Sequence, residues 1–216
     1  MADRRQGLAG KIPLRGAAVA GAAALGIAVY VSLAGQGNGV DAAACASAAP
    51  HAAALDPLIG GEVAAFQMAR EPQKLSDLAF TGPGGEPMTL AAFEGRTALV
   101  NLWATWCGPC RKEMPALDRL QAAMGGEDFV VVPISIDTAE PEKPAQFLES
   151  VGVKNLPLYT DRSTDIFQTL KERGLALGLP VTVLLDRNGC HLGHMNGPAE
   201  WDSEDAMGLL SAALQA

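Results

Sequence analysis

Cys107 and Cys110 stand three residues apart in the stretch WATWCGPCRKEMP, which runs from Trp103 to Pro115. Two cysteines at this spacing can hold a metal ion, cross-link the fold or exchange electrons with another disulfide. A structural zinc site takes four Cys or His ligands, often as two such pairs. The chain has a single Cys-x-x-Cys pair and three histidines scattered along the sequence. The pattern therefore argues against zinc.

The same spacing argues against a cross-link whose purpose is stability. A disulfide between residues three apart closes a very short loop and removes little entropy from the unfolded chain. Electron exchange fits better, because a buried strand is predicted just before Cys107 and a helix just after it. A thiolate at a helix N-terminus is stabilised by the helix dipole and the free N–H groups. We therefore expect Cys107 to be the exposed nucleophile and Cys110 to resolve the mixed disulfide.

Patterns of apolar residues predict the elements that hold this pair. The run TALVNLW (97–103) reads as a buried strand, and residues 110–124 place four apolar side chains on one face of a helix. The other predicted elements are strands at 129–137, 180–186 and 190–197, helices at 142–152, 163–174 (with Ser163 as N-cap) and 202–215, and a turn at 83–87 between two short extended runs. This order predicts an α/β fold with a central mixed sheet and helices on both faces.

Residues 16–35 form an uncharged stretch rich in alanine and glycine. Twenty residues of helix reach about 30 Å, the thickness of a bilayer core. Four basic residues precede the stretch and no Lys or Arg follows it before Arg70, an asymmetry that places the N-terminus in the cytoplasm. We expect an uncleaved, single-pass transmembrane helix in the inner (cytoplasmic) membrane with the catalytic domain in the periplasm. The alternative is that a signal peptidase removes this helix, and two stretches of small residues could serve as its cleavage site: SLAG (32–35) and DAAACA (41–46).

Composition divides the rest of the chain into a stem and a folded domain. Residues 36–60 are alanine-rich, with Asp41 placed to cap a helix over 42–54 that Pro57 ends. Residues 61–216 are predicted to form the folded domain. The formal net charge is −8, and because the anchor segment carries +3, the remainder carries −11. Such an acidic exported region argues against nucleic acid as a partner.

Three sequence features together resemble the thioredoxin superfamily. They are WCGPC (106–110), Pro115 five residues after the second cysteine, and GLPVTVLLD (178–186) far downstream. The longer stretch LVNLWATWCGPCRKEMPALDRL (99–120) is similar to the membrane-anchored TlpA/ResA/CcmG group, and within it to TlpA-type members. The likeness covers residues 61–216. It implies a thioredoxin-like fold and a periplasmic thiol–disulfide oxidoreductase that acts as a reductant, with a redox-active Cys107–Cys110 disulfide and no other cofactor.

The resemblance also implies roles for residues around the cysteines. Pro180 matches the cis-proline of the superfamily, which would expose the backbone of Leu179 to a substrate strand beside the sulfur atoms. Trp106 would shield one side of the disulfide, and Gly108 and Pro109 would complete the substrate-binding surface. Pro109 also suits the first helical turn, where its missing N–H costs nothing. Without the motif, an ordinary proline at the start of a strand would be the simpler interpretation of Pro180.

Two positions suggest a route for the proton. Thioredoxin has a buried acid six residues before its first cysteine, whereas Asn101 at that position here cannot take a proton. Glu113, three residues after Cys110, matches an acid of the ResA-like members. The hypothesis is that Glu113 moves the proton as Cys110 is released. The alternative is a solvated glutamate in the first helical turn. The CGPC sequence itself, shared with thioredoxin, favours a reductant.

Cys45 and Cys190 lie outside the motif. In an oxidising compartment an even leftover pair most often forms a disulfide, and the resemblance to TlpA-type members implies the same extra pair. This structural disulfide would tie the stem to the hairpin. It would close a loop of about 145 residues, for which the chain-entropy relation gives roughly 4–5 kcal/mol. Free thiols, or lipidation of Cys45, are the alternatives.

The stretch CHLGHM (190–195) combines side-chain types that suit copper. On a regular strand, however, residues 190, 191, 194 and 195 do not all share one face. The histidines make no close second pair in the sequence. They are His51, His191 and His194. We therefore expect no metal bound by these residues.

The resemblance finally implies substrates and an electron donor. The expected substrates are a Sco-type copper chaperone or the copper-bearing subunit of cytochrome oxidase, because oxidised cysteines at a copper site cannot bind the metal. The expected donor is a transmembrane protein of the DsbD or CcdA type. Two other functions stay open. They are reduction of apocytochrome c before haem attachment, and a chaperone that holds Cu(I) with Cys107 and Cys110; a peroxidase fits less well.

Overall fold

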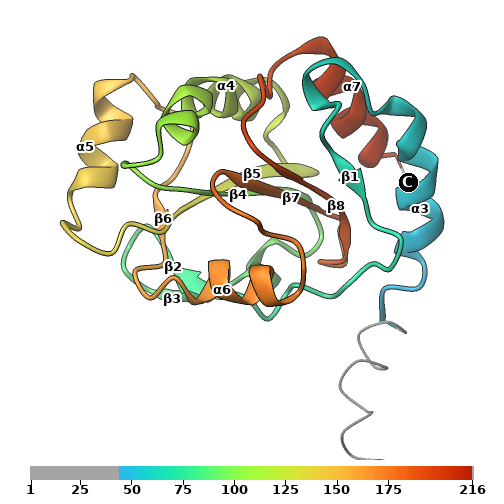
Figure 1. Ribbon diagram of the computed structural model, residues 1–216, viewed down its shortest axis with the longest axis horizontal. Coiled ribbons are helices and arrows are strands. Elements are labelled where there is room, and N and C mark those ends of the chain that lie inside the picture. The colour runs from blue at the N-terminus through green and yellow to red at the C-terminus, as the bar shows by residue number, and fades with distance from the viewer. Residues whose placement is uncertain (1–43, 216) are drawn as a thin grey trace, which may run out of the picture. The chain divides into compact units, whose positions relative to one another are not determined.

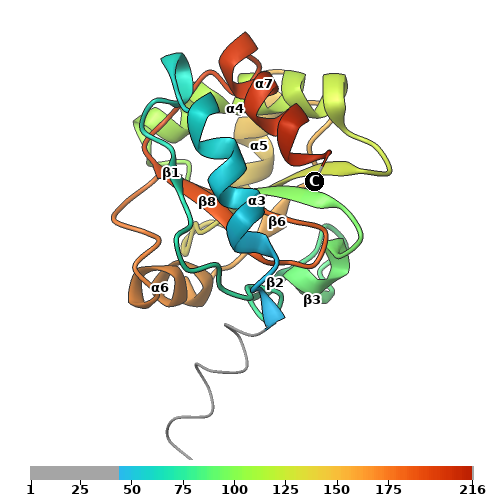
Figure 2. The same cartoon turned by 90° about the vertical axis from the view of Figure 1, so that its right-hand side faces the viewer.

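The computed structural model describes residues 44–215. The predicted transmembrane helix at 16–35 and the predicted cap Asp41 lie outside the described residues. Within the described range, no helix combines the length and the apolar character needed to cross a membrane. The fold below is that of residues 44–215, shown in two views in Figures 1 and 2.

The described residues form one mixed sheet in the strand order β1-β8-β7-β4-β5-β6-β2-β3. The central strands β4 and β5 run parallel, β7 lies antiparallel to β4, and β8 lies antiparallel to β7. All seven residues of β4 and of β5 are buried, as expected for strands covered on both faces. The strands are β1 (Gln67–Met68), β2 (Ala79–Thr81), β3 (Pro87–Thr89), β4 (Thr97–Trp103), β5 (Phe129–Ser135), β6 (Tyr159–Thr160), β7 (Val181–Leu185) and β8 (His191–Asn196).

Helices cover both faces of this sheet (Figure 1). α4 (Gly108–Met124) and α7 (Glu204–Ala213) lie on one face, and α6 (Asp165–Glu172) lies on the other. α5 (Lys143–Ser150) lies near β6, and α3 (Ala48–Leu55) packs against β8. Short 3₁₀ turns are η1 (Asp56–Leu58), η2 (Gly61–Val63) and η3 (Leu90–Phe93). The predicted α/β fold with a mixed sheet and helices on both faces is confirmed.

The structure differs from the sequence prediction at short elements. β1 and β6 were not predicted, because a strand of two residues carries no periodic pattern. The predicted cap Ser163 is wrong: α6 begins at Asp165, after Thr164 with φ 65°. Thr164 makes no capping hydrogen bond with its side chain. The carboxylate of Asp161 supplies one in its place, since it accepts the free N–H of Ile166 in the first turn at 2.9 Å.

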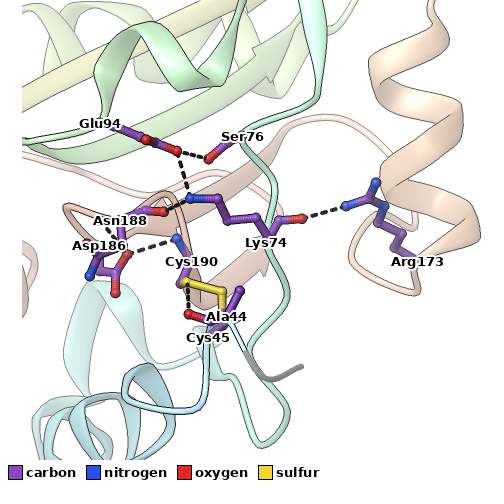
Figure 3. Close-up of a disulfide and its surroundings, with 9 residues drawn as sticks. All are labelled: Ala44, Cys45, Lys74, Ser76, Glu94, Arg173, Asp186, Asn188 and Cys190. Carbon is purple, nitrogen blue, oxygen red and sulfur yellow. Dashed lines mark hydrogen bonds and ion pairs between the residues drawn. A yellow bond between two sulfur atoms is a disulfide. The ribbon is translucent and has the colours of Figure 1, made fainter. Parts of the chain in front are cut away.

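The described part of the predicted stem packs onto the sheet. The helix expected over 42–54 is α3, which buries Ala48, Ala52 and Leu55 among the core residues. Small alanine side chains let the helix approach β8 closely. Just before the helix, Cys45 forms a disulfide with Cys190, with the two Cα atoms 5.6 Å apart (Figure 3). The described stem therefore belongs to the same core as the sheet.

Hydrogen bonds fix the chain around Cys190, at the sheet end of this disulfide (Figure 3). Asp186 Oδ1 accepts the backbone N–H of Cys190 at 2.8 Å. Lys74 forms a bridge with Cys190 across the strands and an ion pair of 2.7 Å with Glu94. The carbonyl of Lys74 also accepts from Arg173 Nη1 at 2.8 Å. The disulfide thus joins the N-terminal segment to a part of the sheet that these hydrogen bonds hold in place.

We predict that the double variant Cys45→Ala/Cys190→Ala lowers the free energy of unfolding by up to about 4–5 kcal/mol, because the bridge closes a long loop. The sequence separation is 145 residues. The measurement is urea unfolding of the oxidised protein. Cys107→Ala/Cys110→Ala is the matched control, since that disulfide spans three residues. A loss of the same size in both variants would contradict the prediction.

Candidate active site

The two motif cysteines lie where β4 turns into α4. β4 ends at Trp103, and Cys107 is the N-cap residue of α4. The pair forms a disulfide with its Cα atoms 5.3 Å apart. The Sγ atom of Cys107 accepts the backbone N–H of Cys110 at 3.2 Å. When the disulfide is reduced, the same N–H and the helix N-terminus stabilise a Cys107 thiolate.

The two sulfur atoms differ in access. Cys107 is 6% exposed, whereas Cys110 is completely buried. Only Cys107 is therefore accessible to the sulfur atom of a partner protein, as an attacking cysteine must be. Gly108 and Pro109 are exposed beside it. The Trp106 side chain is 69% exposed, so it forms part of the protein surface near the disulfide rather than a closed cover over it.

The loop before β7 lies at the same end of the sheet. Val181 pairs with Leu102 on β4, one residue before the end of that strand. The preceding peptide bond, Leu179–Pro180, is cis, as the resemblance implies. Leu179 is half-buried and Leu177 is 81% exposed. The surface around Cys107 thus contains exposed apolar side chains from two separate segments, which suits contact with another protein.

Glu113 is buried beneath this surface. It is 2% exposed, so the alternative of a solvated glutamate is wrong. Its carboxylate accepts hydrogen bonds from Asn101 Nδ2 at 2.8 Å, Trp201 Nε1 at 3.1 Å and the N–H of Ala199 at 3.3 Å. Burial raises the pKa of Glu113 to about 7, although the three hydrogen bonds act in the opposite direction. A carboxyl with this pKa can give or take a proton near neutral pH.

Asn101 links this carboxyl to the strand that follows the cis-proline. Its Nδ2 group donates to Glu113 and also to Thr182 Oγ1 at 2.9 Å, across the β4–β7 pairing. The sequence motif identified Asn101 and Glu113, but not Thr182, Ala199 or Trp201. Their role depends on strand register and on a loop 88 residues away from Glu113 in sequence, and neither leaves a local pattern.

A groove of about 500 Å³ lies beside the disulfide. Trp106, Arg111, Lys143 and Phe147 contribute to its walls. The guanidinium of Arg111 lies 5.0 Å from the ring centre of Phe147, a cation–π contact that holds both side chains in place. The groove extends the surface that a bound protein segment could occupy from the cysteines toward α5.

Among residues 44–215, no three His, Cys, Asp or Glu side chains converge in a way that could hold a metal ion. All four cysteines are oxidised in two disulfides. The chemistry that this geometry supports is dithiol–disulfide exchange.

Comparison with known proteins agrees with this chemistry. Residues 66–209 match the Redoxin family. The chain belongs to this family. It is 30% identical to the thioredoxin-like protein YneN of Bacillus subtilis over 131 residues, which are 58% of this chain and 74% of the relative. It is 28% identical to the thiol-disulfide oxidoreductase ResA of Halalkalibacterium halodurans over 128 residues, with coverage of 58% and 69%.

Comparison with solved structures also finds a thiol–disulfide exchange protein. The fold is similar to that of a Chlorobium tepidum protein described as thiol:disulfide interchange protein DsbE, with a TM-score of 0.56 and 30% identity. The similarity covers 65% of this chain and 95% of the other. The chain is therefore a Redoxin-family thiol–disulfide oxidoreductase of the ResA/DsbE type, with a thioredoxin-like fold.

We predict that Glu113→Gln removes a pH-dependent loss of stability. The pKa of Glu113 is about 7 in the folded protein, compared with 4.5 for an ordinary glutamate in water. Between these values the folded state binds more protons, so the free energy of unfolding falls as pH rises. Relative to Glu113→Gln, the oxidised wild type should lose about 3 kcal/mol between pH 4 and pH 8. Urea unfolding across this range measures the difference.

The same variant tests the proton route. If Glu113 accepts the proton of Cys110, Glu113→Gln should alter the pKa of the Cys110 thiol and the pH–rate profile of disulfide exchange. Thiol pKa values from alkylation rates provide the readout. Identical thiol titrations in the wild type and the variant would show that Glu113 has no part in proton transfer.

We predict that Trp201→Phe raises the pKa of Glu113 above its value of about 7. The variant removes one donor to the carboxylate, and hydrogen bonds to a charged form favour that form. NMR titration of the labelled glutamate carboxyl measures the shift. Trp103→Phe is the matched control, because Trp103 is fully buried but its Nε1 has no hydrogen-bond partner. Equal shifts in both variants would count against the indole bond.

Proposed function

We propose that this chain is a TlpA-type reductant, anchored in the cytoplasmic membrane, that reduces disulfides of periplasmic proteins at copper sites. The observation that carries the exchange chemistry is the environment of the cysteine pair, and the CGPC sequence shared with thioredoxin favours the reducing direction. One sulfur is accessible at the surface, the second is buried, and a carboxyl with a pKa of about 7 lies in the same helix. Such a group can take the proton of the buried thiol before that thiol attacks the mixed disulfide.

The proposed reaction has two steps. The Cys107 thiolate attacks one sulfur of the substrate disulfide; that S–S bond breaks, and a mixed disulfide forms while the second substrate sulfur leaves as a thiolate. Glu113 then takes the proton of Cys110, and the Cys110 thiolate attacks Cys107 Sγ. The second substrate sulfur also leaves as a thiolate, both substrate thiolates are protonated from solvent, Glu113 returns its proton to solvent, and the Cys107–Cys110 disulfide forms. Two electrons have passed to the substrate, and a membrane donor of the DsbD or CcdA type restores the dithiol.

The periplasmic location is supported by two features. The basic residues before the uncharged segment 16–35 favour export of the rest of the chain. The disulfide between Cys45 and Cys190, both buried, is of the structural kind found in oxidising compartments. Neither residue is reached by solvent, so this bridge would persist while Cys107 and Cys110 cycle.

The copper-site substrate rests on the likeness of residues 99–120 to TlpA-type members and on the surface beside the disulfide. That surface presents exposed Trp106 and Leu177 and the groove along α5. It is larger than a small thiol needs and suits a folded protein partner. The proposed partners are a Sco-type copper chaperone or the copper-bearing subunit of an oxidase.

The experiment is capture of the mixed disulfide. Cys110→Ser in the full chain should trap substrates on Cys107 in membranes, because the resolving thiol is missing. Cys107→Ser/Cys110→Ser is the control and should trap nothing. An adduct with a copper-site protein is the expected result. An adduct with apocytochrome c would overturn the copper substrate but not the reductase, and the absence of any adduct would overturn both.

A further inference from the structure

A β-bulge brings two histidines together on one face of the sheet. In the β7–β8 pairing, Val183 lies opposite His194, whereas Leu185 lies opposite His191, and the register shifts between these positions. Leu192 is the extra residue of this bulge. Val183 and Leu185 are two residues apart and point to the same face, so their partners His191 and His194 do as well.

This arrangement corrects one expectation from the sequence. The sequence predicts no close second pair of ligands among the three histidines, but the rings of His191 and His194 lie 5.3 Å apart between centroids, with their planes tilted by 42°. Met195 lies opposite Thr182, on the other face, and Cys190 is in a disulfide. The four candidate copper ligands indeed do not share one face, yet the two imidazoles do.

The nitrogens of this pair lack partners. Both ring nitrogens of His191, which is 2% exposed, and Nδ1 of His194 make no hydrogen bond. Buried polar atoms are normally hydrogen-bonded, so three such nitrogens in one place call for an explanation. Burial lowers the pKa of His191 to about 3 and also lowers the pKa of His194. Both imidazoles are therefore neutral at neutral pH, the form that binds metal ions.

The pair lines a pocket of about 440 Å³. The pocket lies between β8 and residues 66–71, which include β1. Gln67 lies opposite His194 in the β1–β8 pairing and shares its face. Asp56 and Glu71 also line the pocket. Arg70 lines the same pocket, so its charged lining consists of two carboxylates and one guanidinium, beside two neutral imidazoles.

We propose that His191 and His194 together bind one divalent late first-row transition ion, of the class of Cu²⁺ and Zn²⁺, in this pocket. Two imidazoles that bind a tetrahedral ion at about 2.0–2.1 Å have ring centres about 5 Å apart, close to the 5.3 Å found here. Since no third His, Cys, Asp or Glu completes a metal cluster among residues 44–215, water fills the remaining positions, and the site is open rather than a closed structural one.

The site is separate from the cysteine pair. His191 pairs with Leu185, whereas the end of β7 near the cysteines is Val181, which pairs with Asn196. The ion would therefore lie toward the opposite end of β8, next to the Cys45–Cys190 bridge. Because it would bind only the folded arrangement, it should stabilise the fold by mass action. The proposal does not depend on the substrate of the oxidoreductase.

The test uses the oxidised full chain, in which all four cysteines are in disulfides and no thiol competes for the ion. Calorimetric titration with Cu²⁺, and separately with Zn²⁺, should show one equivalent. The EPR spectrum of the Cu²⁺ complex should show coupling to two imidazole nitrogens. His194→Gln should weaken binding at least tenfold, and His51→Gln should leave it unchanged. His194 is chosen because it is only half-buried, and disulfide exchange by Cys107 reports that the variant is folded.

Each other outcome overturns the proposal. Binding that survives His194→Gln with unchanged affinity would place the ion elsewhere. Loss of binding in His51→Gln would assign it to the separate pocket near Asp186 and Arg187. A titration with no heat and no nitrogen coupling for either ion would leave the unpartnered nitrogens without this function.

Discussion

The Glu113 carboxyl lies in the interface between α4 and the sheet, and three segments far apart in the sequence meet around it. Asn101 reaches it from β4, Ala199 and Trp201 reach it from the loop before α7, and Cys110 precedes it by one helical turn. Removing a carboxyl from water is costly unless donors replace the lost hydration. The three donors supply that replacement, so the packing of β4, α4 and the loop before α7 must be in register for the site to exist.

The two disulfides illustrate how burial and loop length separate stability from chemistry. Cys107–Cys110 spans three residues, constrains the unfolded chain little, and keeps one sulfur at the surface. Cys45–Cys190 spans 145 residues and is buried at both ends. A thiolate in solution can attack the first but cannot reach the second. The same covalent bond therefore serves exchange in one place and anchorage of α3 in the other.

Local patterns account for what the sequence predicted. The buried run 97–103 and the helix after Cys107 were predicted because each is fixed by neighbouring residues. The burial of Glu113 was not predicted, because it depends on Trp201, which no local pattern connects to it. The histidine pair was missed for a similar reason. The period of two along β8 is interrupted at Leu192, and only the register against β7 reveals the bulge.

Burial shifts the pKa of Glu113 and the pKa of His191 so that the neutral form of each is favoured, but their surroundings give these shifts different consequences. Burial raises the pKa of Glu113 to about 7, and its three hydrogen-bond donors limit this rise because they stabilise the charged form. His191 has no partner at either nitrogen, and burial lowers its pKa to about 3. A group with ready donors for its charged form is suited to exchange a proton. A group that lacks any partner retains a free lone pair at neutral pH, which is suited to hold a cation instead. The number of hydrogen-bond partners, more than the extent of burial, separates the two kinds of chemistry in this fold.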